Sequence, residues 1–158
     1  LIDLVLTLIK NKCMNIQYYI DKGFEFLCDL HPSDRYTQGI ALKEVRLIKD
    51  NREHYSQPGV YILANRQGEV LKIGQTSNMF NRIYTQYKCV TNATNARIRN
   101  YIKDVEDVTV YIYLTPRKKS TVLGHTVYTS YAMGLEHELL KEFKEVTKTL
   151  PKLNTMIR

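Results

Sequence analysis

Two short hydrophobic runs joined by a polar turn form the clearest pattern in the sequence. Residues 59–64 read Gly-Val-Tyr-Ile-Leu-Ala and residues 69–74 read Glu-Val-Leu-Lys-Ile-Gly, and both are rich in residue types that strands favour. The residues between them, Asn-Arg-Gln-Gly, are typical of a turn. The pattern predicts two antiparallel strands, and it leaves Lys72 as an unexpected charge in the second strand.

A helix is predicted directly after the second strand. Thr76, Ser77 and Asn78 are residue types that cap helix N-termini. Aromatic and apolar residues then recur at helical spacing, at Phe80, Ile83, Tyr84 and Tyr87. Arg82 lies one position from this stripe. It is therefore either a surface residue of an amphipathic helix or a group that binds an oxyanion near the start of the helix.

A carboxylate interrupts the apolar stripe of a later helix. Residues 131–146 have helical periodicity, and Met133, Leu140 and Phe143 share a face with Glu136. A carboxylate at such a position needs a partner, because burying it unpaired costs several kcal/mol. The partner is either a buried Arg or Lys, or a divalent metal ion, which favours carboxylate oxygens.

The remaining patterns complete a small mixed fold. Residues 107–114 predict a third strand, and residues 1–9 read as an amphipathic helix. Apolar positions from Ile16 to Leu27 suggest a second helix, and residues 40–48 fit either a strand or a short helix. We therefore expect an α/β (α+β) fold with a small three-stranded, antiparallel or mixed sheet flanked by helices.

Charge divides the chain into two segments. Residues 1–57 hold 8 Lys or Arg and 8 Asp or Glu, whereas residues 58–158 hold 15 and 8, so the whole net charge of +7 lies in the second segment. A basic face attracts a polyanion. The basic residues gather in two clusters, Arg97, Arg99 and Lys103 and then Arg117, Lys118 and Lys119. Each cluster is either a nucleic-acid contact or a solvated run of charge, and the second is predicted to be a loop.

Cysteine usage and hydropathy bear on the compartment. The three cysteines, at 13, 28 and 89, fit no zinc-binding spacing and leave an odd count, which is typical of a reducing compartment. No stretch reaches the roughly 20 apolar residues of a membrane span. We therefore expect a cytoplasmic protein.

The ordered series of motifs resembles the GIY-YIG nuclease family across about residues 58–154. The first family motif matches residues 59–61, and the second matches residues 72–74, Lys-Ile-Gly. The family's helix Arg matches Arg82, its metal-binding Glu matches Glu136, and its late Asn matches Asn154. Lys72 replaces the usual Tyr of the second motif, a variant that looks like the type II restriction endonuclease branch.

The resemblance implies a role for each matched residue. Tyr61 would take a proton from the attacking water, Lys72 would supply the positive charge that helps this phenol ionise, and Arg82 would hold the scissile phosphate. Glu136 would bind one Mg²⁺ or Mn²⁺ ion. Tyr87 would join the catalytic group, although the spacing from Arg82 is five where four is usual, so Tyr84 could substitute for it.

The function implied is metal-dependent endonucleolytic cleavage of double-stranded DNA, with a restriction-like preference for a fixed site. Residues 58–158 would form the nuclease domain, and residues 1–57 would form a helical segment that covers the core or adds DNA or dimer contacts. Asn154 and the two basic clusters would contact the nucleic acid. Two alternatives stay open, namely a nuclease of repair, phage or mobile-element type without a fixed site, and a non-catalytic nucleic-acid-binding module. A palindromic site is read most simply by a homodimer, which we therefore expect on DNA.

Overall fold

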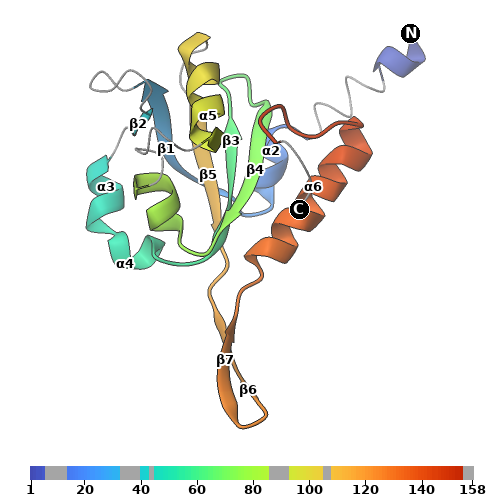
Figure 1. The fold of residues 1–158 in the computed structure, drawn as a ribbon. Coiled ribbons are helices and arrows are strands. Elements are labelled where there is room, and N and C mark those ends of the chain that lie inside the picture. Colours follow the sequence, from blue (N-terminus) through green and yellow to red (C-terminus); the bar gives the residue numbers. More distant parts are fainter. Residues whose placement is uncertain (6–13, 33–39, 43–44, 86–92, 105–107, 155–158) are drawn as a thin grey trace.

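Five antiparallel strands form the central sheet of a computed structural model, in the order β2-β1-β5-β3-β4 (Figure 1). The structure describes residues 1–5, 14–32, 40–42, 45–85, 93–104 and 108–154. The strands are β1 (Glu25–Pro32), β2 (Ile40–Leu42), β3 (Gly59–Ala64), β4 (Val70–Thr76) and β5 (Val108–Leu114). The expected strands at 59–64, 69–74 and 107–114 are thus confirmed as β3, β4 and β5 to within two residues at their ends.

The expected three-stranded sheet is wrong, because the segment before residue 58 contributes two further strands. The helix expected from Ile16 to Leu27 ends early, as α2 (Ile16–Asp21). Gly23 follows with a φ of 110°, a left-handed conformation that stops the helix and that glycine adopts without strain. The apolar residues that follow lie in β1, which pairs with β5. The two segments proposed from the charge pattern therefore share one sheet.

Both alternatives for residues 40–48 occur, one after the other. Residues Ile40–Leu42 form β2 on the outer side of β1. The chain then forms two short helices, α3 (Val45–Asp50) and α4 (Arg52–Tyr55). The expected helix at residues 1–9 falls largely outside the described residues.

Helical segments cover both faces of the sheet and make a three-layer structure (Figure 1). One face is covered by α3, by the short π-helix η1 (Asn81–Thr85) and by α5 (Ala93–Asp104), through Ile48, Ile83 and Ile98. The other face is covered by α2 and α6 (Ala132–Thr147), through Tyr19 and Leu140. Every residue of β3 is buried between these layers.

A two-stranded hairpin extends from one end of the sheet (Figure 1). It consists of β6 (Lys118–Val122) and β7 (His125–Thr129). Gly59 pairs with both Thr76 and Leu114, and the hairpin follows Leu114 closely, so we call the place where these three residues meet the hairpin end of the sheet. The loop expected at 117–119 is therefore wrong for Lys118 and Lys119, which begin β6. Within the described part of the chain, no helix has the length and apolar character to cross a bilayer.

Candidate active site

Tyr61 is the centre of the candidate site. The residue opposite it on the neighbouring strand must be glycine, because a side chain there would overlap the Tyr61 ring. The residue lies on β3 near the hairpin end, is 3% exposed, and faces Gly74 directly across the β3–β4 ladder. A Cβ added at Gly74 would overlap Cζ and the hydroxyl oxygen of Tyr61. The Tyr61 ring therefore lies across the backbone of β4, in space that only glycine leaves open.

Arg82 binds the Tyr61 hydroxyl. Its Nε donates a hydrogen bond of 3.2 Å to the Tyr61 oxygen, and its guanidinium carbon lies 5.5 Å from the centre of the Tyr61 ring. Arg82 is 7% exposed, so it is not the surface residue that one sequence interpretation allowed. The structure brings these two predicted residues together in a buried, charge-assisted contact.

The segment between β4 and η1 places Arg82. The Thr76 hydroxyl accepts from the backbone N–H of Asn78, and Asn78 Oδ1 accepts from the N–H of Asn81, as expected of two predicted capping residues. The described part of the element that follows, Asn81–Thr85, is π-helical where the sequence predicted an α-helix. Such turns occur often at functional sites. Phe80 and Ile83 are buried as predicted, whereas Tyr87 lies outside the described residues.

A second close approach between strands, at the hairpin end of the sheet, requires glycine at position 59. A Cβ added there would lie 2.6 Å from the backbone oxygen of Tyr113 on the neighbouring β5. The loop after β5 is fixed nearby, because the N–H of Thr115 donates to the Pro58 oxygen over 2.8 Å. The sequence analysis did not single out Thr115, whose buried hydroxyl has no hydrogen-bond partner among the described residues. No pattern in the sequence distinguishes this threonine from the others.

Lys72 lies on the same face of the sheet as Tyr61. It pairs with Leu63, two residues beyond Tyr61, and stands two residues before Gly74. Alternate residues of a strand point to one face, so the register puts these four residues on one side. Lys72 is half-buried. Lys72 is therefore a charged residue in a mostly buried strand, β4, as the sequence indicated.

Glu136 occupies a buried position on α6. It is 6% exposed and belongs to a stripe that also contains Ala132, Leu140 and Phe143. Met133, which was expected on this stripe, is instead 64% exposed, because it lies one position past Ala132 and turns toward solvent. The helix packs on β4 and β3 and begins at the hairpin end of the sheet (Figure 1), so Glu136 lies in the part of α6 nearest that end.

Asn154 holds the outer edge of β4. Its Oδ1 accepts from the N–H of Ile73 over 2.9 Å, and its Nδ2 donates to the Ile73 oxygen over 2.8 Å. The N–H of Leu153 adds a bond to the Leu71 oxygen over 2.8 Å. The side-chain amide therefore acts as one more residue of a strand beside β4, next to Lys72 and Gly74.

The two predicted basic clusters lie on different elements. Arg97 and Arg99 are on α5, exposed and half-buried respectively, and Lys103 belongs to the same helix. Arg117 precedes β6 and donates a weak hydrogen bond of 3.4 Å to the Ser77 oxygen, while Lys118 and Lys119 are exposed at the base of the hairpin. The second cluster is thus the one at the hairpin end, close to the segment that leads to Arg82.

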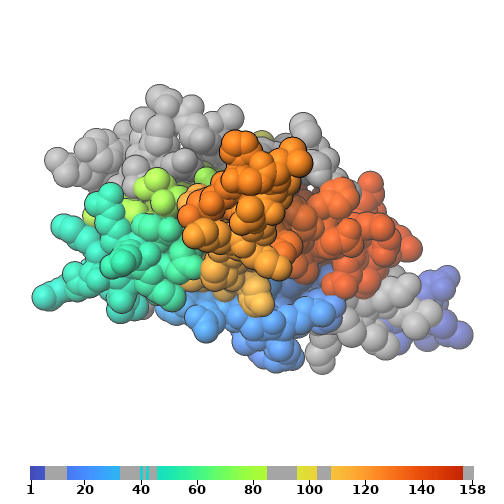
Figure 2. Space-filling model, turned by 90° about the horizontal axis from the view of Figure 1, so that it is seen from below, coloured from blue at the N-terminus to red at the C-terminus, as the bar shows by residue number. Residues whose placement is uncertain are grey.

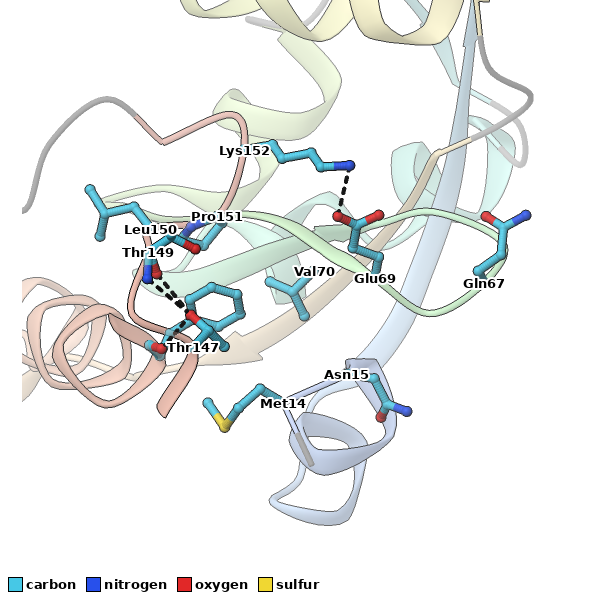
Figure 3. A pocket seen from close by; sticks show the side chains of 11 residues that line it. Met14, Asn15, Gln67, Glu69, Val70, Thr147, Thr149, Leu150, Pro151 and Lys152 are labelled. Atoms are coloured by element: carbon cyan, nitrogen blue, oxygen red, sulfur yellow. Dashed lines mark hydrogen bonds and ion pairs between the residues drawn. The ribbon is translucent and has the colours of Figure 1, made fainter. Parts of the chain in front are cut away.

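A surface hollow of about 630 Å³ lies at the opposite end of the sheet (Figure 3). Its walls include Val70, Phe143 and Leu150, and two further lining residues, Lys152 and Glu69, form an ion pair with 2.9 Å between Nζ and the carboxylate oxygen. The hydrogen bond to the Glu69 carboxylate raises the pKa of Lys152 above its usual range. None of the matched motif residues lines this hollow, so we do not place the chemistry there.

The side chains near the candidate site decide whether a divalent metal ion could bind there. Among the described residues, no three His, Cys, Asp or Glu side chains lie close enough to form a metal site by themselves. Protein sites for Mg²⁺ commonly use one or two carboxylates, with water and substrate phosphate oxygens completing the coordination. A single buried carboxylate at Glu136 fits that pattern.

The solved structures that resemble this chain include two nucleases. Restriction endonuclease HPY188I in complex with product DNA has a TM-score of 0.56 and 18% identity, covering 90% of this chain and 87% of that chain. A mutant of bacteriophage T4 EndoII has a TM-score of 0.59 and 16% identity, covering 86% and 98%. No protein-family model and no curated protein matches the sequence. The protein therefore shares its fold with a restriction endonuclease and with T4 EndoII.

Proposed function

We propose that the protein is a Mg²⁺- or Mn²⁺-dependent DNA endonuclease of the GIY-YIG type, with a restriction-like preference for a fixed site. The observation that carries the proposal is the buried contact between Arg82 Nε and the Tyr61 hydroxyl, made across the glycine of the second motif. The fold shared with restriction endonuclease HPY188I supports it. The net charge of +7 suits a polyanionic substrate.

Tyr61 acts as the general base in this proposal. A guanidinium that donates to a phenol oxygen favours negative charge on that oxygen. The phenolate then takes one proton from a water molecule, the water oxygen attacks phosphorus, and the bond from phosphorus to the leaving oxygen breaks. Lys72, on the same sheet face, adds positive charge near the Tyr61 oxygen.

In this proposal Arg82 binds the scissile phosphate and Glu136 holds the metal ion that neutralises its charge. A guanidinium carries five N–H donors in a rigid fork, so one side chain can bind both the Tyr61 oxygen and a phosphate. Glu136 would hold the divalent ion, which when bound supplies a Lewis acid that neutralises charge on the phosphate and the leaving oxygen. The position of Asn154 supports a positioning role, because its amide fixes the backbone between Lys72 and Gly74.

Plasmid cleavage by Glu136→Gln tests the proposal. Gln keeps the shape of the side chain and loses the charge that holds the metal, so we expect cleavage to be abolished while duplex binding and the unfolding midpoint stay close to those of the wild type. Removal of divalent ions by a chelator should stop the wild-type enzyme. Glu138→Gln is the matched control, because Glu138 is exposed on the same helix.

The outcomes separate the candidate functions. Near wild-type cleavage by Glu136→Gln would overturn the metal assignment, and unfolding of this variant would favour a structural ion pair at Glu136. Discrete plasmid fragments support a fixed site, a smear supports a nuclease without one, and no cleavage by the wild type would leave a binding module.

We further infer a homodimer on DNA. A two-fold partner would place one active site on each strand of a palindromic site. The segment before residue 58 is balanced in charge and exposes Phe26 on β1 and Leu47 on α3, which suits a contact between copies. Sedimentation with and without duplex tests this, and a strict monomer in both states would exclude it.

A further inference from the structure

Among the described residues, the β6–β7 hairpin has no packing role that explains it. All residues of β7 are exposed, and within β6 only Ser120 is partly covered. Figure 2 looks along the hairpin toward the body and shows it standing between α3–α4 on one side and α6 on the other. A two-stranded hairpin alone is marginally stable in water, so an exposed hairpin of this kind points to a contact outside the chain.

The tip of the hairpin adds a second observation. Leu123 and Gly124 form the turn with φ values of 51° and 78°. Such a turn favours Asn-Gly, and an apolar residue with positive φ is strained. Leu123 is also 92% exposed, and neighbouring Val122 is 53% exposed. Strain and exposure together at one apolar side chain are not explained by folding and indicate a contact.

The strand register sorts the hairpin side chains onto two faces. Lys119 pairs with Tyr128 and Thr121 pairs with Thr126, so these four residues share one face, which we call the polar face. All four are exposed and all carry hydrogen-bonding groups. The opposite face carries Lys118, Ser120, Val122, His125, Val127 and Thr129.

The charge and size of the hairpin indicate its partner. No acidic residue occurs between Asp107 and Glu136, whereas Arg117, Lys118 and Lys119 add three positive charges. Strands of five residues span about 16 Å and lie about 5 Å apart. The major groove of B-DNA is about 12 Å wide and admits a two-stranded β-ribbon.

We propose that the β6–β7 ribbon enters the major groove of duplex DNA and reads base edges with its polar face, Lys119, Thr121, Thr126 and Tyr128. Arg117 and Lys118 bind phosphates at the groove wall, and Leu123 contacts a base methyl group at the tip. This inference rests on the proposed action on duplex DNA, and it names the residues that select the site.

The connection of the ribbon to the candidate active site supports this assignment. Arg117 at the ribbon base donates to the Ser77 oxygen, and Ser77 stands between the second motif and Arg82. The ribbon and the Tyr61–Arg82 contact are thus both attached at the hairpin end of the sheet. A groove contact made by the ribbon would fix which phosphate meets Tyr61.

A second copy of the chain fits the ribbon less well. Two ribbons packed about a two-fold axis would bring like charges together, because the ribbon holds no acidic residue. The exposed aliphatic residues are only Val122, Leu123 and Val127, too few for the core of a standard interface of roughly 800 Å² per partner.

A matched pair of variants tests the inference. Lys119→Met and Lys118→Met remove the same charge and the same N–H donors from adjacent residues on opposite faces. Each is measured by fluorescence anisotropy on a duplex that the wild type selects from a random library, and on the same duplex with deazaguanine, which lacks the N7 acceptor of the major groove. Thermal unfolding verifies that both variants are folded.

We expect the wild type and Lys118→Met to bind the deazaguanine duplex about tenfold more weakly than the normal one. Lys119→Met should bind both duplexes equally, because its side chain has no N–H donor for N7. Equal binding of both duplexes by the wild type would overturn the major-groove contact, and a reversed pattern between the two variants would overturn the polar-face assignment.

A shortened ribbon provides the second measurement. Deleting residues 121–122 and 125–126 keeps the Leu123-Gly124 turn and the strand alternation, and removes only exposed residues. We expect this variant to keep its fold, to lose the deazaguanine effect and to cleave DNA without site preference. Loss of a dimer in sedimentation, with the deazaguanine effect retained, would instead make the ribbon a contact between copies and overturn the inference. A wild type that discriminates between the duplexes and never cleaves would refute the proposed catalysis and leave the ribbon assignment standing.

Discussion

Strands β3 and β7 both pair in antiparallel ladders, but they lie in opposite surroundings. All six residues of β3 are buried between two helical layers, and all five of β7 are exposed. β3 pairs on both sides, with β4 and β5, whereas β7 pairs with β6 alone. Packing therefore restricts every side chain of β3, while only the turn and one ladder restrict those of β7.

The difference in burial means that packing selects the side chains of β3, whereas a binding partner can select those of the β6–β7 hairpin. In β3, the catalytic candidate Tyr61 depends on neighbours that leave space, such as Gly74. In the ribbon, side chains such as Lys119 and Leu123 contribute nothing to a core, so their identity can follow the needs of a partner. Substitutions in β3 and its neighbours should change both stability and activity, and those in the ribbon should mainly change binding.

Gly74→Ala should have the largest effect. The added Cβ would overlap Tyr61, and overpacking of this kind costs about 1–3 kcal/mol of stability. Displacement of Tyr61 from the phosphate should lower the cleavage rate about 100-fold. Gly134→Ala on α6 is the control, because nothing lies within 4 Å of its Cβ and Ala favours the helix by roughly 0.5–1 kcal/mol. Wild-type midpoint and activity in Gly74→Ala would show that Tyr61 does not need this space.

Neutralising the ribbon base should change binding and leave stability nearly unaltered. Replacement of Arg117, Lys118 and Lys119 by Gln should lower the slope of log K against log salt by about 0.9 for each phosphate that the protein no longer neutralises. The unfolding free energy should move by less than about 0.5 kcal/mol per residue, since these side chains are exposed. Replacing Lys141, Lys144 and Lys148, at exposed positions on and after α6, removes the same charge. Equal slopes for the two triple variants would place the ribbon base away from the duplex.

Leu123→Asn should stabilise the ribbon while it weakens binding. Asn accepts positive φ more readily than Leu, so relief of strain should contribute about 0.5–1 kcal/mol. Hydrogen exchange of the β6 and β7 amides measures the gain, which should appear as slower exchange in the ribbon and no change in β3. Exchange in the ribbon that is no slower than in the wild type would mean that the turn is not a source of strain.

Lys152→Met should have the smallest effect on stability, and the effect should appear only at pH values at which Lys152 is protonated. The pKa of Lys152 is raised in the folded state by Glu69, so the pair stabilises the fold below the ordinary lysine pKa of about 10.4, and this contribution disappears as pH rises through the folded-state value. Both side chains are well exposed, at 62% and 44%, so we expect only about 0.2–1 kcal/mol. Urea unfolding of both proteins at neutral pH and above pH ~11 measures the difference. A difference that persists at high pH or in concentrated salt would point to weaker packing without the lysine chain.

Hydrophobic periodicity predicted the elements of the buried part well. It located β3, β4, β5 and α6 and the buried position of Glu136, because each of these elements is packed into the core. It failed where burial does not set the pattern. The ribbon after residue 117 has no alternation of apolar and polar residues, since neither face is packed, and its sequence therefore resembles that of a loop.

Long-range contacts could not be predicted from periodicity either. The pairing of β1 with β5 joins residues about 80 positions apart, and no local signal marks it. Arg82 was expected to meet a phosphate, but its contact with Tyr61 depends on how η1 turns back over the sheet. The family resemblance supplied the residues of the candidate site, and the geometry supplied the reason for the two glycines.

The bonds of Asn154 to Ile73 also have a consequence for solubility. β4 is the outermost strand on its side, and an open edge is a template on which another chain can add a strand and start aggregation. Leu153 and Asn154 occupy this edge at Leu71 and Ile73, beside the most apolar stretch of the strand. The segment after α6 that carries Leu153 and Asn154 thus protects β4, the strand that carries Lys72, against intermolecular β-pairing.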